Sequence, residues 1–137
     1  MELLERNQQL IEAFRADKNK VDGQFGGRPL LLLTTIGAKS GARRTSPLAY
    51  TADGDQFVIM ASNNGLEIHP NWYRNLQANP RVTVEVGNDT FEATASVAEG
   101  AERVRLFAKV VAGMPGFGEY QAKIQRQIPV VVLTRQK

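Results

Sequence analysis

Very short turns between strand-like segments are the feature that most limits what this chain can fold into. Asp53-Gly54 separates the segments 44–52 and 56–62, and Gly87-Asn88-Asp89 separates an alternating segment from 91–97. Tight turns of this kind join antiparallel neighbours, whereas parallel strands need a crossover of about a dozen residues or more. The turns therefore argue against repeated strand–helix–strand units and favour antiparallel hairpins.

The other strand-like segments extend this pattern to a mainly β chain with flanking helices. Leu30 to Ile36 is a continuous apolar run that ends at Gly37, which predicts a buried strand. An alternating strand is expected over 82–86, and a final strand from Ile128 to Thr134. About six mostly antiparallel strands predict a small barrel or a strongly curled sheet.

Helical periodicity places the helices between and outside these strands. Apolar residues recur at helical spacing over about 2–16, which predicts an N-terminal amphipathic helix followed by a polar, glycine-rich connector. Pro70 suits the first turn of a second helix, which Pro80 closes. A helical face over 104–111 and a short helix to about 127 precede the final strand. No repeat is apparent, so residues 1–137 are expected to form a single domain.

Composition restricts the classes of function. The chain has no cysteine and one histidine, so a disulfide framework, a thiolate metal site and a site of several histidines are excluded, and no metal is expected. No apolar stretch reaches the roughly 20 residues of a membrane-spanning helix, and the glutamates near the N-terminus are not typical of a signal peptide. A net charge of +3 is too small to indicate nucleic-acid binding. We expect a cytoplasmic protein, with peripheral association with the inner face of the membrane left open.

The segment from Gly37 to Arg44 combines glycines with cationic side chains. It reads GAKSGARR, so Lys39 and Ser40 lie between glycines and two arginines follow. Glycine lets backbone amides approach an anion closely, and arginine binds phosphate through two parallel hydrogen bonds. The segment matches neither the phosphate-binding loop of nucleotide hydrolases nor a dinucleotide fingerprint. Residue types alone leave a solvated hairpin loop and an anion-binding loop as alternatives.

Two later segments can also be interpreted either as structural or as ligand-binding. Over Met60 to Pro80, polar residues at a strand end precede Trp72 and Asn75, which either address the polar edge of a planar heterocycle or serve as a core anchor and a solvated helix residue. Over Met114 to Leu133, aromatic residues share one helical face, which indicates core packing or a wall beside a planar ligand. His69 precedes a proline and is more typical of a helix N-terminus than of a catalyst.

Three stretches together resemble the deazaflavin-dependent nitroreductase family: LLLTTIGAKSGARRTSPLAY, MASNNGLEIHPNWYRNLQANPRVTVEVG and MPGFGEYQAKIQRQIPVVVL. The resemblance covers nearly the whole chain, in the right order. Proteins of this family are split β-barrels, similar to FMN-binding split barrels, and use coenzyme F420, a deazaflavin with a phosphate-linked polyglutamate tail. The resemblance implies hydride transfer from reduced deazaflavin to an electron-poor acceptor, namely a quinone, a nitroaromatic compound or an activated enone.

The resemblance also implies roles for individual residues. The phosphate and acidic tail would be held by Lys39, Ser40, Gly41, Arg44 and Pro47. The deazaflavin ring would lie against Met60, Ala61, Ser62, Asn63, Trp72 and Asn75. The acceptor would contact Met114, Phe117 and Tyr120, and Tyr120 or Ser62 would donate or relay a proton, with solvent as an alternative source. Phe117 and Met114 replace aromatic residues, often tyrosines, of other members, so the preferred acceptor is not implied.

Two other functions remain open from the sequence. One is an FMN-dependent oxidoreductase on the same barrel, since a phosphate-binding loop would serve FMN as well. The other is a non-enzymatic protein that binds deazaflavin or a fatty acyl ligand. In each case the expected partner is a small molecule, and the chain is expected to be a monomer or a homodimer.

Overall fold

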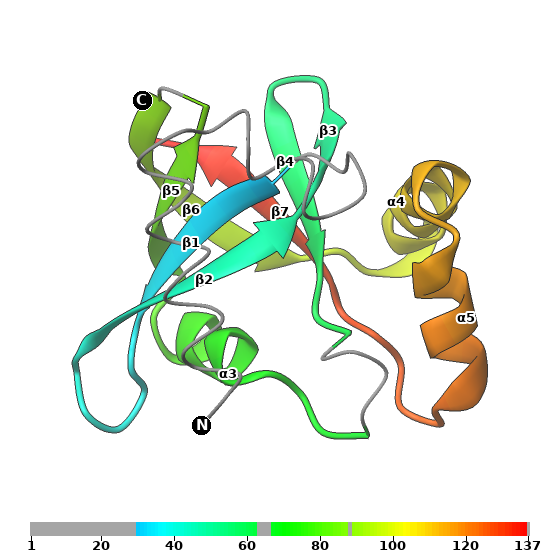
Figure 1. Cartoon of the computed structure of the whole chain (residues 1–137), viewed down its shortest axis with the longest axis horizontal. Coiled ribbons are helices and arrows are strands. Elements are labelled where there is room, and N and C mark those ends of the chain that lie inside the picture. Colours follow the sequence, from blue (N-terminus) through cyan, green and yellow to red (C-terminus); the bar gives the residue numbers. More distant parts are fainter. Residues whose placement is uncertain (1–29, 63–66, 88, 137) are drawn as a thin grey trace.

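One curled antiparallel sheet forms the centre of the protein (Figure 1). The computed structural model describes residues 30–62, 67–87 and 89–136. The sheet has seven strands in the order β2-β1-β5-β6-β7-β4-β3. The strands are β1 (Leu30–Ile36), β2 (Arg43–Ala49), β3 (Thr51–Asp53), β4 (Gln56–Met60), β5 (Arg81–Val86), β6 (Asp89–Val97) and β7 (Val130–Arg135). The helices in these ranges are α3 (Asn71–Ala78), α4 (Gly100–Gly113) and α5 (Gly116–Lys123).

The connection between β2 and β3 closes the sheet into a barrel. These strands stand at opposite ends of the strand order, yet only Tyr50 separates them in the chain. β2 pairs with β1, whereas β3 pairs with β4. A sheet whose two edges are joined by one residue has to curl until the edges meet, which confirms the predicted split β-barrel. The expectation of one strand over 44–52 is wrong, because the chain changes pairing partner at Tyr50. The sheet of the described residues therefore has seven strands instead of about six.

The barrel has a split, which is a place where two neighbouring strands are not hydrogen-bonded to each other. β2 pairs with β1 along one edge, and its other edge pairs with no strand in the described part of the chain. Ile59 and Met60 pair with β7, while the pairing of β4 with β3 ends at Val58. The end of β4 and the free edge of β2 are therefore the two borders of the split.

Several element boundaries differ slightly from the expected ones. β4 ends at Met60 instead of Ser62, and β7 begins at Val130 instead of Ile128. Pro129 lacks a backbone N–H group and cannot donate to the sheet, which explains the later start of β7. α5 ends at Lys123, because Ile124 adopts an extended backbone with φ −118° and ψ 155°. The amphipathic helix expected over about 2–16 lies outside the described residues.

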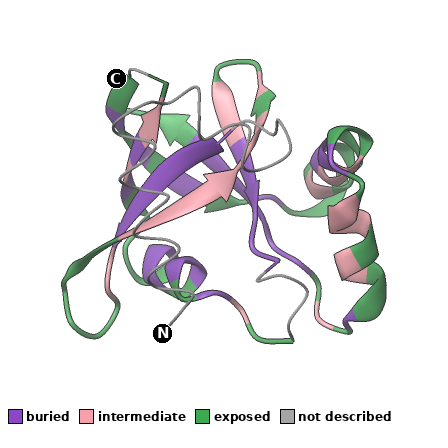
Figure 2. Ribbon diagram, in the orientation of Figure 1, coloured by how far each residue is buried: buried purple, intermediate pink, exposed green. Residues whose placement is uncertain are grey.

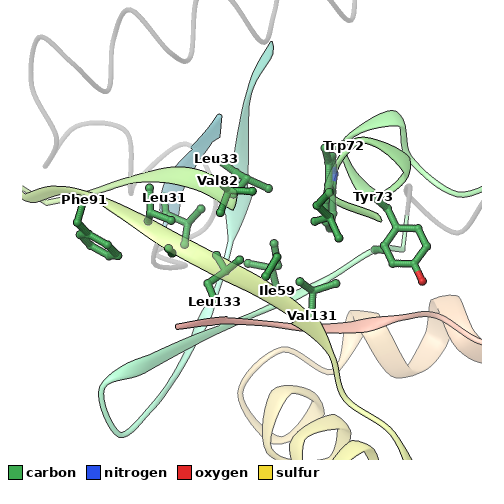
Figure 3. Packing of buried hydrophobic residues seen from close by; sticks show 14 residues of the cluster. Leu31, Leu33, Ile59, Trp72, Tyr73, Val82, Phe91, Val131 and Leu133 are labelled. Atoms are coloured by element: carbon green, nitrogen blue, oxygen red, sulfur yellow. The ribbon is translucent and has the colours of Figure 1, made fainter. Parts of the chain in front are cut away.

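Two hydrophobic cores lie on opposite faces of the curled sheet. The interior core includes Leu31 and Leu33 of β1 and is covered at one end by Trp72 and Leu76 of α3 (Figure 3). The outer core lies under α4 and α5, where Leu106 and other helical residues pack on the outward side chains of β4 and β7. Figure 2 shows β1 buried along its length and α3 buried on its sheet-facing side. Each strand thus contributes alternate residues to different environments.

An ion-pair cluster attaches α4 to the β3–β4 turn. The Asp53 carboxylate lies 2.9 Å from Arg105 Nη2 and 3.0 Å from Lys109 Nζ. Hydrogen bonds from these two cations hold the pKa of the Asp53 carboxyl group well below its usual value. The cluster holds the middle of α4 against this turn, and α4 in turn packs against α5.

We expect Leu33→Ala to lower the free energy of unfolding by about 2–5 kcal/mol, because the side chain is fully buried in the interior core. Urea denaturation monitored by circular dichroism measures the change. Val104→Ala is the control, since that side chain is 68% exposed and its loss should change the free energy by less than about 0.5 kcal/mol. Equal losses in both variants would show that the interior core is not packed as described.

Candidate functional site

The loop between β1 and β2 is a hairpin loop with a compact hydrogen-bonded backbone. Gly37 N donates to Ala42 O at 2.7 Å, and Gly41 N donates to Gly37 O at 3.0 Å. Ala42 N donates to Ser40 Oγ at 3.1 Å. Gly41 has φ +72°, which favours glycine, and a Cβ on Gly37 would lie 2.6 Å from Ser40 Oγ. The loop shape therefore depends on Gly41, and a side chain at position 37 would displace the Ser40 hydroxyl that accepts from Ala42 N.

This loop nevertheless presents several unpaired positive groups. The backbone N–H groups of Lys39 and Ser40 donate to no other described residue. The side chains of Lys39 and Arg44 are exposed and form no ion pair within the described part of the chain. Consecutive free amides beside cationic side chains are the groups that bind oxyanions. The two interpretations of this segment are thus compatible: it is a hairpin loop, and anion binding by it stays a prediction.

Arg43 and Arg44 leave β2 on opposite faces. In the register with β1, Arg44 is opposite Thr35 and Arg43 is opposite Ile36. Arg43 Nη2 lies 3.5 Å from Thr83 Oγ1 on the outer face, where it lines a pocket of about 130 Å³. Because side chains alternate along a strand, Arg44 shares the inner face with Thr35, on the side of α3. Of the two arginines, only Arg44 therefore faces the same side as the predicted site residues on α3.

Asn75 connects the loop to α3 and β1. Its side chain is 8% exposed. Asn75 Oδ1 accepts from Ala38 N at 3.0 Å, and Asn75 Nδ2 donates to Thr35 Oγ1 at 3.1 Å. The interpretation of Asn75 as a solvated helix residue is therefore wrong. Its predicted contact with the deazaflavin ring stays a prediction.

Trp72 and Ala61 belong to the interior core. Trp72 is 8% exposed and packs among residues of that core, as a core anchor does (Figure 3). Ala61 is fully buried in the same cluster, whereas the preceding residue, Met60, points to the outer core. The end of β4 thus presents successive residues to both faces, next to the split of the barrel.

Arg126 holds the chain just after β4. Its guanidinium donates to Ala61 O at 3.2 Å, to Ser62 O at 2.9 Å and to His69 Nδ1 at 3.1 Å. Burial, together with the positive charges of Arg126 and Arg74, lowers the pKa of His69 below its ordinary 6.5. His69 is therefore a neutral acceptor for Arg126 at neutral pH and not a free catalytic base.

Sequence reasoning missed Arg126 as a site-forming residue. Its signal was a single cation shortly before the apolar final strand, which resembles any surface arginine. Ser62, whose backbone oxygen Arg126 binds, is buried. Asn63, predicted beside it, lies outside the described residues.

The predicted acceptor wall on α5 is partly a core feature. Met114 is 5% exposed and belongs to the outer core, together with Met60. Phe117 and Tyr120 are half-buried, with ring centroids 6.1 Å apart in an edge-to-face arrangement. The Tyr120 hydroxyl makes no hydrogen bond to another described residue. Met114 therefore packs as core, while Phe117 and Tyr120 keep exposed surface for a ligand.

The three groups of predicted residues form an extended arrangement (Figure 1). The β1–β2 loop lies at one side of the molecule, α3 lies in the middle and α5 lies at the other side, with the end of β4 between the two helices. Pro47 is on β2, which borders the split. Such an arrangement suits a long ligand with its charged end at the loop rather than a compact one.

The described residues lack the features of a metal site and of a membrane-spanning helix. No group of histidine and acidic side chains within the described ranges is arranged to hold a metal ion. None of the helices in that part of the chain has the length and apolarity needed to cross a membrane.

Comparisons with known proteins agree with one another. A family model described as F420H(2)-dependent quinone reductase matches residues 6–135. A Mycobacterium tuberculosis (strain H37Rv) protein named F420H(2)-dependent quinone reductase is 39% identical over 135 residues, which cover 93% of this chain and 91% of that protein. A solved structure named F420-H2 dependent reductase (FDR-A) is 40% identical, with a TM-score of 0.72, and covers 77% of this chain and 94% of its own. Another, described as a domain-swapped dimer, is 35% identical with a TM-score of 0.72 and covers 90% and 98%.

Proposed function

The chain belongs to the F420H(2)-dependent quinone reductase family, and we propose that it transfers a hydride from reduced coenzyme F420 to a quinone. The observation that carries this proposal to the residues is the β1–β2 loop, whose unpaired amides and cations fit an acidic cofactor. An FMN-dependent oxidoreductase and a non-enzymatic binding protein are not favoured by the family match. Nitroaromatic compounds and activated enones stay predicted acceptors.

The residues of the loop fit the phosphate and acidic tail of F420. The free N–H groups of Lys39 and Ser40 supply donors that need no rearrangement, and the side chains of Lys39 and Arg44 supply positive charge. Ser40 Oγ accepts from Ala42 N, which leaves its hydroxyl hydrogen for a ligand oxygen. Gly41 permits the backbone conformation that exposes these groups.

We propose a position for the ring from the position of the loop. With the tail at the loop, the ring would lie toward the end of β4 and α5 (Figure 1), where Met60, Ser62 and Tyr120 are the predicted contacts. α3, which carries Trp72 and Asn75, lies between these two ends (Figure 1), and we propose that Trp72 supports the site from the core.

The mechanism that we propose divides the chemistry between cofactor and protein. Bound reduced deazaflavin supplies a hydride from its C5 atom. The apolar side chains of Met60, Met114 and Phe117 exclude water, and the arrangement of the site orients the quinone. A quinone that accepts a hydride becomes a hydroquinone monoanion and needs one proton to become the hydroquinone. The unpartnered hydroxyl of Tyr120 donates it, with Ser62 or solvent as the alternative source.

We extend the proposal to the protein's partners and location. The acceptor is a small molecule, and the solved relative described as a domain-swapped dimer supports a homodimer over a monomer. We propose a cytoplasmic location, and peripheral contact with a membrane would bring the site close to lipid-soluble quinones.

The dependence of cofactor affinity on salt concentration tests the proposed function. We expect F420 to bind more tightly than FMN, because the loop cations face a polyanionic tail that FMN lacks. Raising the salt concentration should weaken F420 binding, since exposed charges are screened over about 10 Å at 0.1 M salt. Fluorescence titration across salt concentrations, followed by turnover with a quinone, measures both points. Equal affinity for the two cofactors at every salt concentration would contradict the proposal.

The two arginines of β2 provide a matched pair of variants. We expect Arg44→Ala to weaken F420 binding by about 1–3 kcal/mol, because it removes a charge-assisted contact. Lys39→Ala should weaken it by a similar amount for the same reason. Arg43→Ala is the control, because Arg43 points to the outer face, and it should have the smaller effect. Thermal unfolding should change little in all three, since exposed cations contribute little to stability. A larger loss for Arg43→Ala than for Arg44→Ala would reverse the assignment of faces.

Tyr120 is tested by two substitutions with different consequences. We expect Tyr120→Phe to keep F420 affinity and to lower turnover by about tenfold to a thousandfold, because one positioned proton donor is lost. Tyr120→Ala should in addition lower stability, because the ring packs against the outer core. Steady-state kinetics and thermal unfolding separate the effects. Unchanged turnover in Tyr120→Phe would leave Tyr120 as a packing residue and solvent as the proton source.

A further inference from the structure

We propose that Asn75 is a positioning residue for the anion-binding loop: its buried side-chain amide holds the loop so that the N–H groups of Lys39 and Ser40 point outward, unpaired. This inference rests on the proposed function for the identity of the anion. The positioning itself rests on contacts within the protein.

The backbone hydrogen bonds of the loop show how much depends on Asn75. The N–H groups of Gly37, Gly41 and Ala42 all bond within the loop. Ala38 N donates to Asn75 Oδ1, which is the hydrogen bond that connects residues 37–42 to another described element. The loop is thus hydrogen-bonded internally, and a single side chain attaches it to α3.

The orientation of Asn75 is fixed on its other side by Thr35. Ala38 N is a donor, so the Asn75 oxygen has to face the loop and Nδ2 has to face β1. There it donates to Thr35 Oγ1, and the Thr35 side chain is fully buried. A buried polar group left without a partner is costly, so the two hydrogen bonds hold the amide in one orientation.

The position of Ala38 links this contact to anion binding. Its peptide immediately precedes the free N–H groups of Lys39 and Ser40, so rotation of the Ala38 peptide would redirect both. Donors that are already oriented cost no rearrangement when an anion binds. Loss of the Asn75 contact should therefore reduce affinity for the phosphate and tail without affecting affinity for the ring.

Two variants separate positioning from direct contact. Asn75→Leu removes both hydrogen bonds, and Thr35→Val removes one while Thr35, at 0% exposure, has no surface for a ligand. Gln77→Leu is the matched control, because this amide on the same helix donates to the Tyr73 hydroxyl and not to the loop. Circular dichroism verifies folding, and where Asn75→Leu fails to fold, Thr35→Val carries the test.

The affinity of each variant is measured for F420 and for a deazaflavin that lacks the phosphate and tail. We expect the dissociation constant for F420 to rise about twofold to tenfold in Thr35→Val and more in Asn75→Leu, in line with one and two lost hydrogen bonds. The affinity for the tail-less deazaflavin and the behaviour of Gln77→Leu should stay as in the unmodified protein. An equal loss for both ligands would overturn the proposal, because it would indicate that Asn75 contacts the ring.

Hydrogen exchange of the Ala38 amide in the ligand-free protein provides the second readout. We expect faster exchange at Ala38 in both variants and unchanged exchange in Gln77→Leu, since only the first two disturb the contact. Unchanged exchange at Ala38 in Asn75→Leu would overturn the positioning role. If the unmodified protein fails to bind F420 while Ala38 exchange responds as expected, the proposed function fails and the positioning of the loop stands.

Discussion

The covalent link between the two edge strands through Tyr50 governs the rest of the structure. An open sheet can spread, but a sheet whose outermost strands are one residue apart in the chain has to close on itself. The closure is incomplete, because β2 pairs only with β1 among the described strands, and the end of β4 pairs only with β7. No hydrogen bonds of the sheet therefore join β2 to β4. Closure creates the interior core, and its incompleteness leaves the border on which Arg44, Pro47 and Met60 lie.

The helices cover the faces that this barrel leaves exposed, and each also supplies part of the site. α3 covers the interior with Trp72 and reaches the loop through Asn75. α4 is attached by the Asp53 ion pairs and carries α5, whose aromatic residues pack near Met60. Residues that stabilise the fold and residues proposed to bind the cofactor are thus neighbours on the same elements, which explains why composition could not tell them apart.

Much of the fold was predictable, because local patterns determine it. Alternating apolar residues and glycine-containing turns identify hairpins without knowledge of the rest of the chain, and the structure has β3–β4 and β5–β6 as expected. The break at Tyr50 was not predictable, because a change of pairing partner leaves the alternation along the strand intact. Asn75 and Arg126 were not assigned their contacts either, since these reach 40 residues to Thr35 and 64 residues to Ser62. Roles of individual site residues came from family resemblance and not from periodicity.

The opposite orientations of Arg43 and Arg44 have a consequence for how the chain can change in length. In a strand with a period of two, one inserted or deleted residue exchanges the two faces. Such a change within β2, between Arg44 and Leu48, would turn Arg44 outward, away from Thr35 and α3, while Leu48 stays packed against the interior core, although the composition of the segment would be nearly the same. The segment therefore tolerates changes in length by even numbers of residues better than by odd numbers, so an alignment of this region is informative about binding only when the parity of its gaps is taken into account.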